Sequence, residues 1–296
     1  MHLLKSLSLP DFPSGSSINF YREKLYLVGD DANSILILDP AYQKIGSLQL
    51  FEHTEKRIPK KEKADLEASA FLTINGIEHL LIMGSGSKRL RKRILLIPFE
   101  KQVLDLTRSS VVDTGTFIDR VKSHGIDEVN FEGVTSIGDS VIISNRGNRE
   151  NITNHLIITD ARFWSVQKEV KLRIIDLRVP SFSSNIPGVS EIFYEESLDL
   201  LLMALSSEDT TNAYDDGAIG NSYIGWIKNF NTKCANGVLM IDGIICLPDI
   251  HPDFEREKIE GLCVEMIEGN FLVIHLISDN DQGESKLFKV KLPIPA

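Results

Sequence analysis

The stretch that decides the fold is KLYLVGDDAN at residues 24–33, an apolar run that stops abruptly in small and acidic residues. Such a run is typical of a buried β-strand that enters a turn. The pattern returns along the chain as HLLIMGSGS (79–87), SVIISNRGN (140–148), LLLMALSSEDT (200–210) and FLVIHLISDND (271–281). Five copies within 296 residues indicate a repeated structural unit.

Each copy is flanked by further strand-like segments. A quieter segment precedes each apolar run, and these segments are SGSSINF (14–20), ADLEASAF (64–71), NFEGVTSI (130–137), GVSEIFY (188–194) and KIEGLCVEM (258–266). A third strand follows each run, and a fourth follows in most units. Four antiparallel strands at a roughly constant spacing are typical of propeller blades. We therefore predict an all-β, five-bladed β-propeller, with six blades as the alternative count and a two-domain β-sandwich arrangement as the rival fold.

The whole chain, residues 1–296, is predicted to form one domain. The blades are expected at about residues 14–51, 64–112, 130–175, 188–247 and 258–292. The last unit ends after its third strand, and a spare β segment, LLKSLSL (3–9), precedes the first unit. We expect this N-terminal strand to complete the final blade and close the ring, which protects sheet edges. No helix of any length is expected, and DFEREKIEG (253–261) is interpreted as a connecting loop.

The charge balance and the cysteines restrict the partners and the compartment. The chain has 42 acidic and 32 basic residues, a net charge of −10, which argues against a nucleic-acid partner. It contains neither an apolar run of ~18 residues nor the apolar core of a signal peptide. Cys234, Cys246 and Cys263 are interpreted as buried thiols. We predict a cytoplasmic protein without a membrane or nucleic-acid partner, although a periplasmic or secreted protein whose leader had been removed would look the same.

Two polar sets are expected to meet at one mouth of the propeller channel. The innermost strand of a blade begins on the same face as the turn between its second and third strands. The strand starts contribute Ser16, Glu67, Glu132, Ser190 and Glu260, with Glu191 in place of Ser190 if the register shifts by one residue. The turns contribute Asp30, Asp31, Ser85, Ser87, Asn145, Arg146, Glu208, Asp209, Asp279 and Asp281.

Glu67, Glu132 and Glu260 would repel one another around a narrow channel. At ~6 Å and an effective dielectric constant of ~20, each pair costs roughly 3 kcal/mol. Protonation, basic neighbours or a bound cation would relieve this repulsion. Oxygen ligands without His or Cys suit Ca²⁺ or Mg²⁺ better than Zn²⁺, so we predict a divalent cation, Ca²⁺ before Mg²⁺, and no organic cofactor. In the alternative interpretation, Lys63 and Lys258 neutralise the ring through salt bridges.

The expected partner is a small molecule, which the hydrolase hypothesis takes to be anionic, and a protein partner is left open. Its pocket is predicted to contain Ser16, Asp30, Ser85, Ser87, Arg91, Asn145, Ser190, Glu208 and Asp279. One hypothesis is a metal-assisted hydrolase of a small phosphoester or lactone, in which Arg146 orients the substrate and Asp209 or Asp281 is the general base. The alternative is a non-catalytic module that binds a ligand or a protein, with a structural ion or a salt-bridged channel. The basic segment KRIPKKEK (56–63) is interpreted as a solvated loop.

The spaced motifs also resemble those of an uncharacterised bacterial β-propeller family. They include K-x-D-x-E (63–67), N-R-G-N (145–148), S-x-E-D-T-x-N (206–212), K-I-E (258–260) and S-D-N-D (278–281). The sequence departs from the expected pattern at Asn221 and Glu191. A more distant similarity to phytase-like and gluconolactonase-like calcium-binding propellers implies a metal at the channel but no specific reaction.

Overall fold

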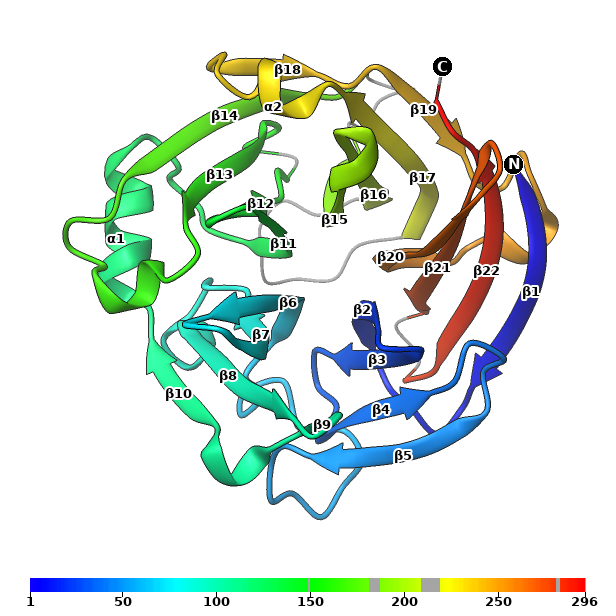
Figure 1. Ribbon diagram of the computed structural model, residues 1–296, viewed down its shortest axis with the longest axis horizontal. Coiled ribbons are helices and arrows are strands. Elements are labelled where there is room, and N and C mark those ends of the chain that lie inside the picture. Colours follow the sequence, from blue (N-terminus) through cyan, green and yellow to red (C-terminus); the bar gives the residue numbers. More distant parts are fainter. Residues whose placement is uncertain (149, 181–186, 209–218, 281–282, 296) are drawn as a thin grey trace.

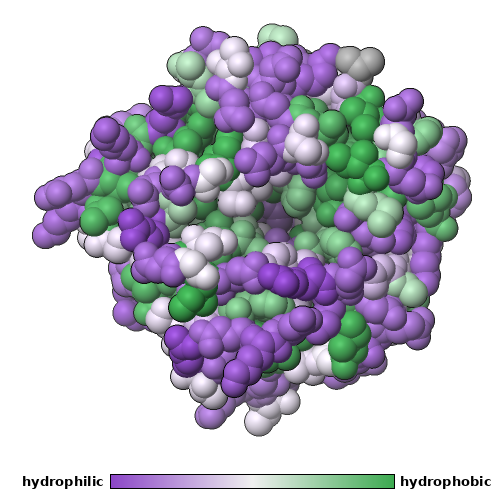
Figure 2. All heavy atoms as spheres, in the orientation of Figure 1, coloured by the Kyte–Doolittle hydropathy of each residue, from purple (hydrophilic) through white to green (hydrophobic). Residues whose placement is uncertain are grey.

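The fold consists of five small antiparallel sheets arranged in a ring around a central channel (Figure 1). The structure is a computed structural model that describes residues 1–148, 150–180, 187–208, 219–280 and 283–295. The predicted five-bladed propeller is therefore confirmed. The space-filling view shows a hollow at the centre of the ring (Figure 2). Among the described residues, no helix has the length and apolarity that crossing a membrane would require.

The first two blades are consecutive in the chain, and each begins at the channel. The first contains β2 (Gly15–Tyr21), β3 (Lys24–Gly29), β4 (Ser34–Leu38) and β5 (Lys44–Gln49). The second contains β6 (Leu66–Ile74), β7 (Ile77–Gly84), β8 (Arg93–Glu100) and β10 (Ser110–Asp113), with the short β9 (Val103–Leu104) also paired to β8. Apolar residues of the neighbouring blades pack together, as Val28 and Ile82 do, and such clusters make up the core between sheets.

The third and fourth blades each have the predicted four antiparallel strands, and the sheet of the third blade has one additional strand, β18 (Val238–Met240). The third contains β11 (Phe131–Ile137), β12 (Ser140–Asn145), β13 (Asn154–Asp160) and β14 (Leu172–Arg178). The fourth contains β15 (Gly188–Glu195), β16 (Leu200–Glu208), β17 (Ile219–Lys228) and β19 (Gly243–Cys246).

The segment GVLMIDGIICL (237–247), which the sequence pattern predicts as the fourth strand of the fourth blade, is divided between two blades. Its first part, β18 (Val238–Met240), pairs in parallel with β14 of the third blade. Asp242 turns the chain between the two parts, since its carboxylate accepts hydrogen bonds from the Lys228 amide and from Lys233. Leu239 and Ile241 are buried in the core between the third and fourth blades, and this burial stabilises β18 beside β14.

The ring closes through the N-terminal strand, as predicted. The fifth blade contains β20 (Lys258–Glu268), β21 (Phe271–Asp279), β22 (Ser285–Pro293) and β1 (His2–Leu9). Strand β1 pairs antiparallel with β22, so the two ends of the chain lie in one sheet (Figure 1). This pairing covers the edge that β22 would otherwise expose.

The expectation of no helix is wrong for α1 (Gly115–Ser123), which lies at the rim between the second and third blades (Figure 1). Phe117, Ile118 and Val121 form its buried face, and the rings of Phe117 and Phe163 lie 4.3 Å apart. The spacing of these three residues is the helical signal in the sequence. The remaining helical turns are α2 (Phe230–Lys233) and 3₁₀ turns at Arg89–Arg91, Leu106–Arg108, Phe163–Ser165, Glu196–Leu198 and Pro252–Phe254. The last of these overlaps the start of the segment 253–261, interpreted from the sequence as a loop, and strand β20 begins at Lys258 in the same segment.

Candidate functional site

A β-bulge interrupts the innermost strand of every blade near its start. The strand register shifts between Gly15 and Ser17, Leu66 and Ala68, Phe131 and Gly133, Val189 and Glu191, and Ile259 and Gly261. The residues passed over are Ser16, Glu67, Glu132, Ser190 and Glu260, which we call the bulge layer. A bulge leaves one residue outside the ladder and redirects its side chain. The positions predicted as equivalent are thus a repeated structural feature.

The two serines of the bulge layer connect neighbouring blades. The Ser16 hydroxyl donates to the carbonyl of Leu66 at 2.5 Å, and the Ser190 hydroxyl donates to the carbonyl of Ile259 at 2.6 Å. Each acceptor is the residue before a glutamate of the bulge layer. Both serines are buried. Their hydroxyls therefore position the glutamate-bearing strands and are engaged with backbone, although both were predicted as pocket residues.

The three glutamates of the bulge layer converge at the channel. Carboxylate oxygens of Glu67, Glu132 and Glu260 lie within 4.8 Å of one another, although the residues come from three blades. Asp30, Asp65 and Glu67 form a second such group among the described residues. Glu67 belongs to both groups, so the two carboxylate clusters are continuous.

Arg146 lies between two of these glutamates. Its Nη1 is 3.6 Å from Glu132 Oε2 and 3.5 Å from Glu260 Oε1, and its Nη2 donates to the Ser206 hydroxyl at 3.0 Å. A Cβ at Gly188 would lie 2.6 Å from Arg146 Nε, so this glycine leaves room for the arginine. We predicted that Arg146 orients an anionic substrate; in the structure its guanidinium lies between two carboxylates and is a countercharge to them.

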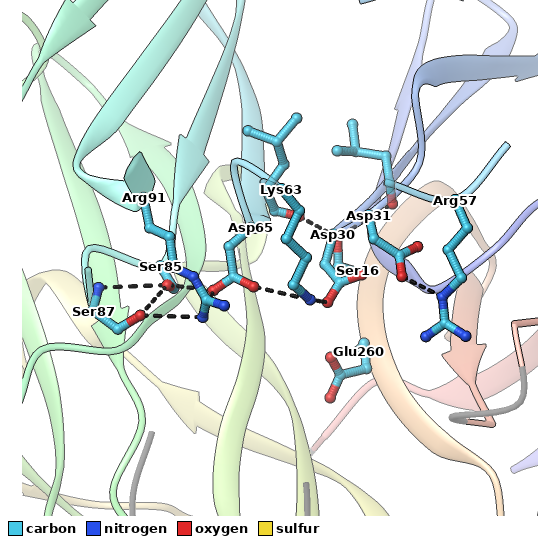
Figure 3. Close-up of polar contacts among 12 residues, drawn as sticks. Ser16, Asp30, Asp31, Arg57, Lys63, Asp65, Ser85, Ser87, Arg91 and Glu260 are labelled. Atoms are coloured by element: carbon cyan, nitrogen blue, oxygen red, sulfur yellow. Dashed lines mark hydrogen bonds and ion pairs between the residues drawn. The ribbon is translucent and has the colours of Figure 1, made fainter. Parts of the chain in front are cut away.

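Lys258 and Lys63 supply further positive charge, as the salt-bridged alternative requires. Lys258 Nζ lies 3.2 Å from Glu260 Oε1. Lys63 forms an ion pair with Asp30 and a second one, of 3.0 Å, with Asp65 (Figure 3). The interpretation of residues 56–63 as a solvated loop is wrong for Lys63, which is only 9% exposed. Burial opposes its charge, but the carboxylates of Asp30 and Asp65 raise the pKa of Lys63.

Arg91 and two serines hold the far side of Asp65. Arg91 Nη1 lies 2.6 Å from Asp65 Oδ2, and the Ser85 hydroxyl donates to the same oxygen at 2.5 Å (Figure 3). Arg91 also donates to the Ser87 hydroxyl at 3.3 Å. These three predicted pocket residues therefore gather around an acid that we did not select. The signal for Asp65 was its place in the K-x-D-x-E motif, between Lys63 and Glu67.

The acids still outnumber the cations within this cluster. Among the described residues, Asp30, Asp65, Glu67, Glu132 and Glu260 face Lys63, Arg91, Arg146 and Lys258, so the cluster would carry one excess negative charge if all five acids were ionised. Burial, and then the neighbouring carboxylates Asp65, Asp30 and Glu132, raise the pKa of Glu67 well above its ordinary range. Burial likewise raises the pKa of Asp30 to about 7, against the opposing charge of Lys63. The cluster thus retains protons that another cation could replace.

The remaining predicted residues have different positions. Asn145 Oδ1 accepts from the Asn130 amide at 2.8 Å, so Asn145 caps the start of the inner strand of its blade. Asp279 lines a cavity beside Asp30. Asp209 and Asp281, the predicted general bases, lie outside the described residues, as does the side chain of Glu208.

The sequence matches a known family, and the fold resembles solved structures. Residues 11–292 match a family described as "Family of unknown function (DUF6929)". No curated protein matches the sequence significantly. The structure is similar to glutaminyl cyclase from Myxococcus xanthus, with 10% identity, a TM-score of 0.52 and coverage of 99% of this chain and 97% of that one. A catalytically inactive virginiamycin B lyase from Staphylococcus aureus with quinupristin has 9% identity, a TM-score of 0.44 and coverage of 97% and 99%. At these identities the likeness concerns the fold.

Proposed function

The chain belongs to this family of unknown function, and we propose from its own residues that the channel mouth binds a divalent cation through Glu67, Glu132 and Glu260. The observation that carries the proposal is the approach of their carboxylate oxygens to within 4.8 Å of one another. Carboxylate oxygens are the ligands that Ca²⁺ and Mg²⁺ prefer. The Oε1 atom of Glu260 is buried and accepts no hydrogen bond, although it faces Lys258 and Arg146 at ion-pair distance.

Ca²⁺ fits this arrangement better than Mg²⁺. The bulges hold the three glutamates on separate strands, so the ligands have an irregular geometry set by the propeller. Ca²⁺ accepts six to eight oxygens in flexible geometries, whereas Mg²⁺ demands a near-ideal octahedron. Three protein carboxylates leave positions for water or for an oxygen of a small anionic ligand.

A binding role agrees with the site better than hydrolysis of a phosphoester or lactone. The hydrolase hypothesis needs Arg146 to orient the substrate, but this guanidinium contacts Glu132 and Glu260. We therefore propose a non-catalytic module whose ion holds a small ligand at the channel mouth. A panel of phosphoesters and lactones, assayed with and without a chelator, separates the two roles, because chelator-sensitive hydrolysis would overturn the non-catalytic one.

The cation itself is tested by calorimetric titration of metal-free protein with Ca²⁺ and with Mg²⁺. We expect saturable Ca²⁺ binding that is tighter than Mg²⁺ binding and that releases protons, because the raised pKa of Glu67 keeps its carboxyl partly protonated. Titrations in two buffers of different ionisation enthalpy measure that release. Glu67→Gln should weaken Ca²⁺ binding at least about tenfold, since it removes one ligand charge.

Glu78→Gln is the matched control. Glu78 lies on the surface in an ion pair with Arg22, so the same chemical change there should leave the Ca²⁺ affinity unaltered. Wild-type protein that binds no Ca²⁺ at millimolar concentration would refute the proposal. In that case, Arg146, Lys258 and bound protons would neutralise the three glutamates without a metal ion.

A further inference from the structure

The cavity beside Asp30 lies next to the carboxylate clusters, under the segment that connects the first two blades. Its volume is about 310 Å³, and its walls include Ser14, Asp30, Asp31, Arg57, Lys60 and Asp279. This volume is at the lower end of the range of about 300–1,000 Å³ that is usual for ligand pockets. The cavity therefore suits a small molecule rather than a polymer.

Three residues that line this cavity each have one buried oxygen atom for which the described residues provide no hydrogen-bond partner. These atoms are Ser14 Oγ, Asp30 Oδ1 and Asp31 Oδ1. Ser14 is 1% exposed and Asp31 is 4% exposed. The Asp30 amide donates to the Ser14 carbonyl at 2.9 Å, so these two residues are direct neighbours, and Asp31 follows in the chain. Buried acceptors without partners are rare in native proteins, and three in one cavity call for a ligand that donates hydrogen bonds.

The protein holds these acceptors in place through their other oxygens. Asp30 Oδ2 forms an ion pair with Lys63, and Asp31 Oδ2 forms one with Arg57. Asp30 and Asp31 lie side by side between these two cations (Figure 3). Each carboxylate is therefore anchored by one oxygen while the other is left for a partner. The segment that carries Arg57 is itself fixed, since the Ile58 amide donates to the Asp31 carbonyl at 2.8 Å.

We propose that this cavity binds the ammonium group of a small primary amine. An ammonium group has three N–H donors and no acceptor, which matches three acceptor oxygens. Two of these belong to carboxylates, so the positive charge is matched as well. Arg57 and Lys60 line the same cavity and provide positive charge for an acidic group elsewhere on the ligand. The ligand class is thus a small amine, and an amino acid-like zwitterion fits better than an amine alone.

This proposal goes beyond the cation site and does not depend on it. None of the three unpartnered oxygens belongs to Glu67, Glu132 or Glu260. Titrations in the presence of a chelator therefore test the amine alone, so failure of one proposal is distinguishable from failure of the other. Burial raises the pKa of Asp30 to about 7, and a cation in the cavity would favour its ionised form.

The experiment uses three probes of equal carbon number, namely butylamine, 4-aminobutyrate and butyrate. Each is titrated into the intact protein and followed by NMR chemical-shift changes. We expect saturable millimolar binding of butylamine, tighter binding of 4-aminobutyrate and no binding of butyrate. Binding of butyrate as strong as that of butylamine, or saturation by neither amine, would overturn the proposal and leave ordered water as the partner of the three oxygens.

Two variants locate the ammonium group. Asp31→Asn should weaken amine binding at least about tenfold, because it removes a charge-assisted hydrogen bond. Asp11→Asn is its control, since Asp11 forms an exposed ion pair with Lys56 of the same segment outside the cavity. Ser14→Ala removes an oxygen that bonds to nothing in the protein, so it should weaken amine binding several-fold while the melting temperature stays equal or rises. Unchanged amine affinity in both cavity variants would refute the placement.

Discussion

The bulge layer and the residues that directly follow it in each inner strand form two neighbouring layers of the channel. The two layers differ in the surroundings of their buried acids. The following layer contains Ser17, Ala68, Gly133, Glu191 and Gly261. Its single acid, Glu191, accepts hydrogen bonds from the Ser17 hydroxyl at 2.8 Å and from the Ile192 amide at 3.0 Å. The bulge layer instead brings three acids together.

The pKa values of Glu67 and Glu191 are both raised, but the causes differ. For Glu191 the cause is chiefly burial, hydrogen bonds from Ser17, Ile192 and Val134 oppose it, and the charge of Glu132 adds a smaller increase. For Glu67, burial is joined by the charges of Asp65, Asp30 and Glu132. Glu191 has hydrogen-bond donors and one acidic neighbour that raises its pKa, whereas three acids raise the pKa of Glu67, so a bound cation would relieve more repulsion at Glu67.

The largest effect should come from filling the space beside Glu191. A Cβ at Gly133 would lie 2.7 Å from Glu191 Oε1 and 2.7 Å from the Ile192 amide nitrogen, and the latter cannot move aside. We expect Gly133→Ala to lower the free energy of unfolding by about 3 kcal/mol in urea denaturation. Gly46→Ala is the control, because no atom lies within 4 Å of a Cβ there, and it should change stability by less than about 0.5 kcal/mol. Equal stability of the two variants would contradict tight packing in the following layer.

The pH dependence of stability should show the proton on Glu191. The unfolded chain releases this proton near the ordinary pKa of 4.5, whereas the folded protein keeps it to higher pH. The free energy of unfolding therefore falls as the pH rises above 4.5, by up to about 1.4 kcal/mol per pH unit, until the pH reaches the pKa of Glu191 in the folded protein.

Glu191→Gln should remove this contribution, so that in urea denaturation the free energy of unfolding of the variant rises relative to wild type as the pH increases above about 5. Glu67→Gln should show a similar gain without Ca²⁺ and lose it when Ca²⁺ is present, since the ion takes the place of the proton at the bulge layer alone. Parallel pH profiles of wild type and Glu191→Gln would contradict a retained proton.

The smallest effect concerns the serines. Ser190→Ala deletes the hydrogen bond to the Ile259 carbonyl and should cost about 1 kcal/mol of unfolding free energy. Ser144 is equally buried, but its hydroxyl has no hydrogen-bond partner, so Ser144→Ala should cost less or stabilise the protein. A thermal denaturation series of the two variants measures the difference, and an equal loss in both would show that the Ser190 bond contributes nothing between the fourth and fifth blades.

The repeat could be predicted from the sequence because most strands of a blade are consecutive in the chain. Alternating apolar runs with polar turns recur in each unit, and the residue that bulges in each inner strand stands at the same place in the pattern. The division of residues 237–247 between two blades was not readable, since it depends on which neighbouring sheet buries Leu239 and Ile241. Helix α1 carried a local signal in Phe117, Ile118 and Val121 that the surrounding strand pattern hid.

The sequence by itself determined that five similar β units would form a ring and that Glu67, Glu132 and Glu260 would face its axis, because strand periodicity and turn chemistry act over short distances. Only the tertiary structure decided which charges meet. Arg146 lies on the third blade and reaches Glu260 of the fifth, and Lys63 bridges Asp30 and Asp65 of two blades. Such pairings depend on distances across the ring, as do the oxygens left without partners on Ser14 and Asp31. Electrostatic energy follows separation in space, and chain order does not encode that separation.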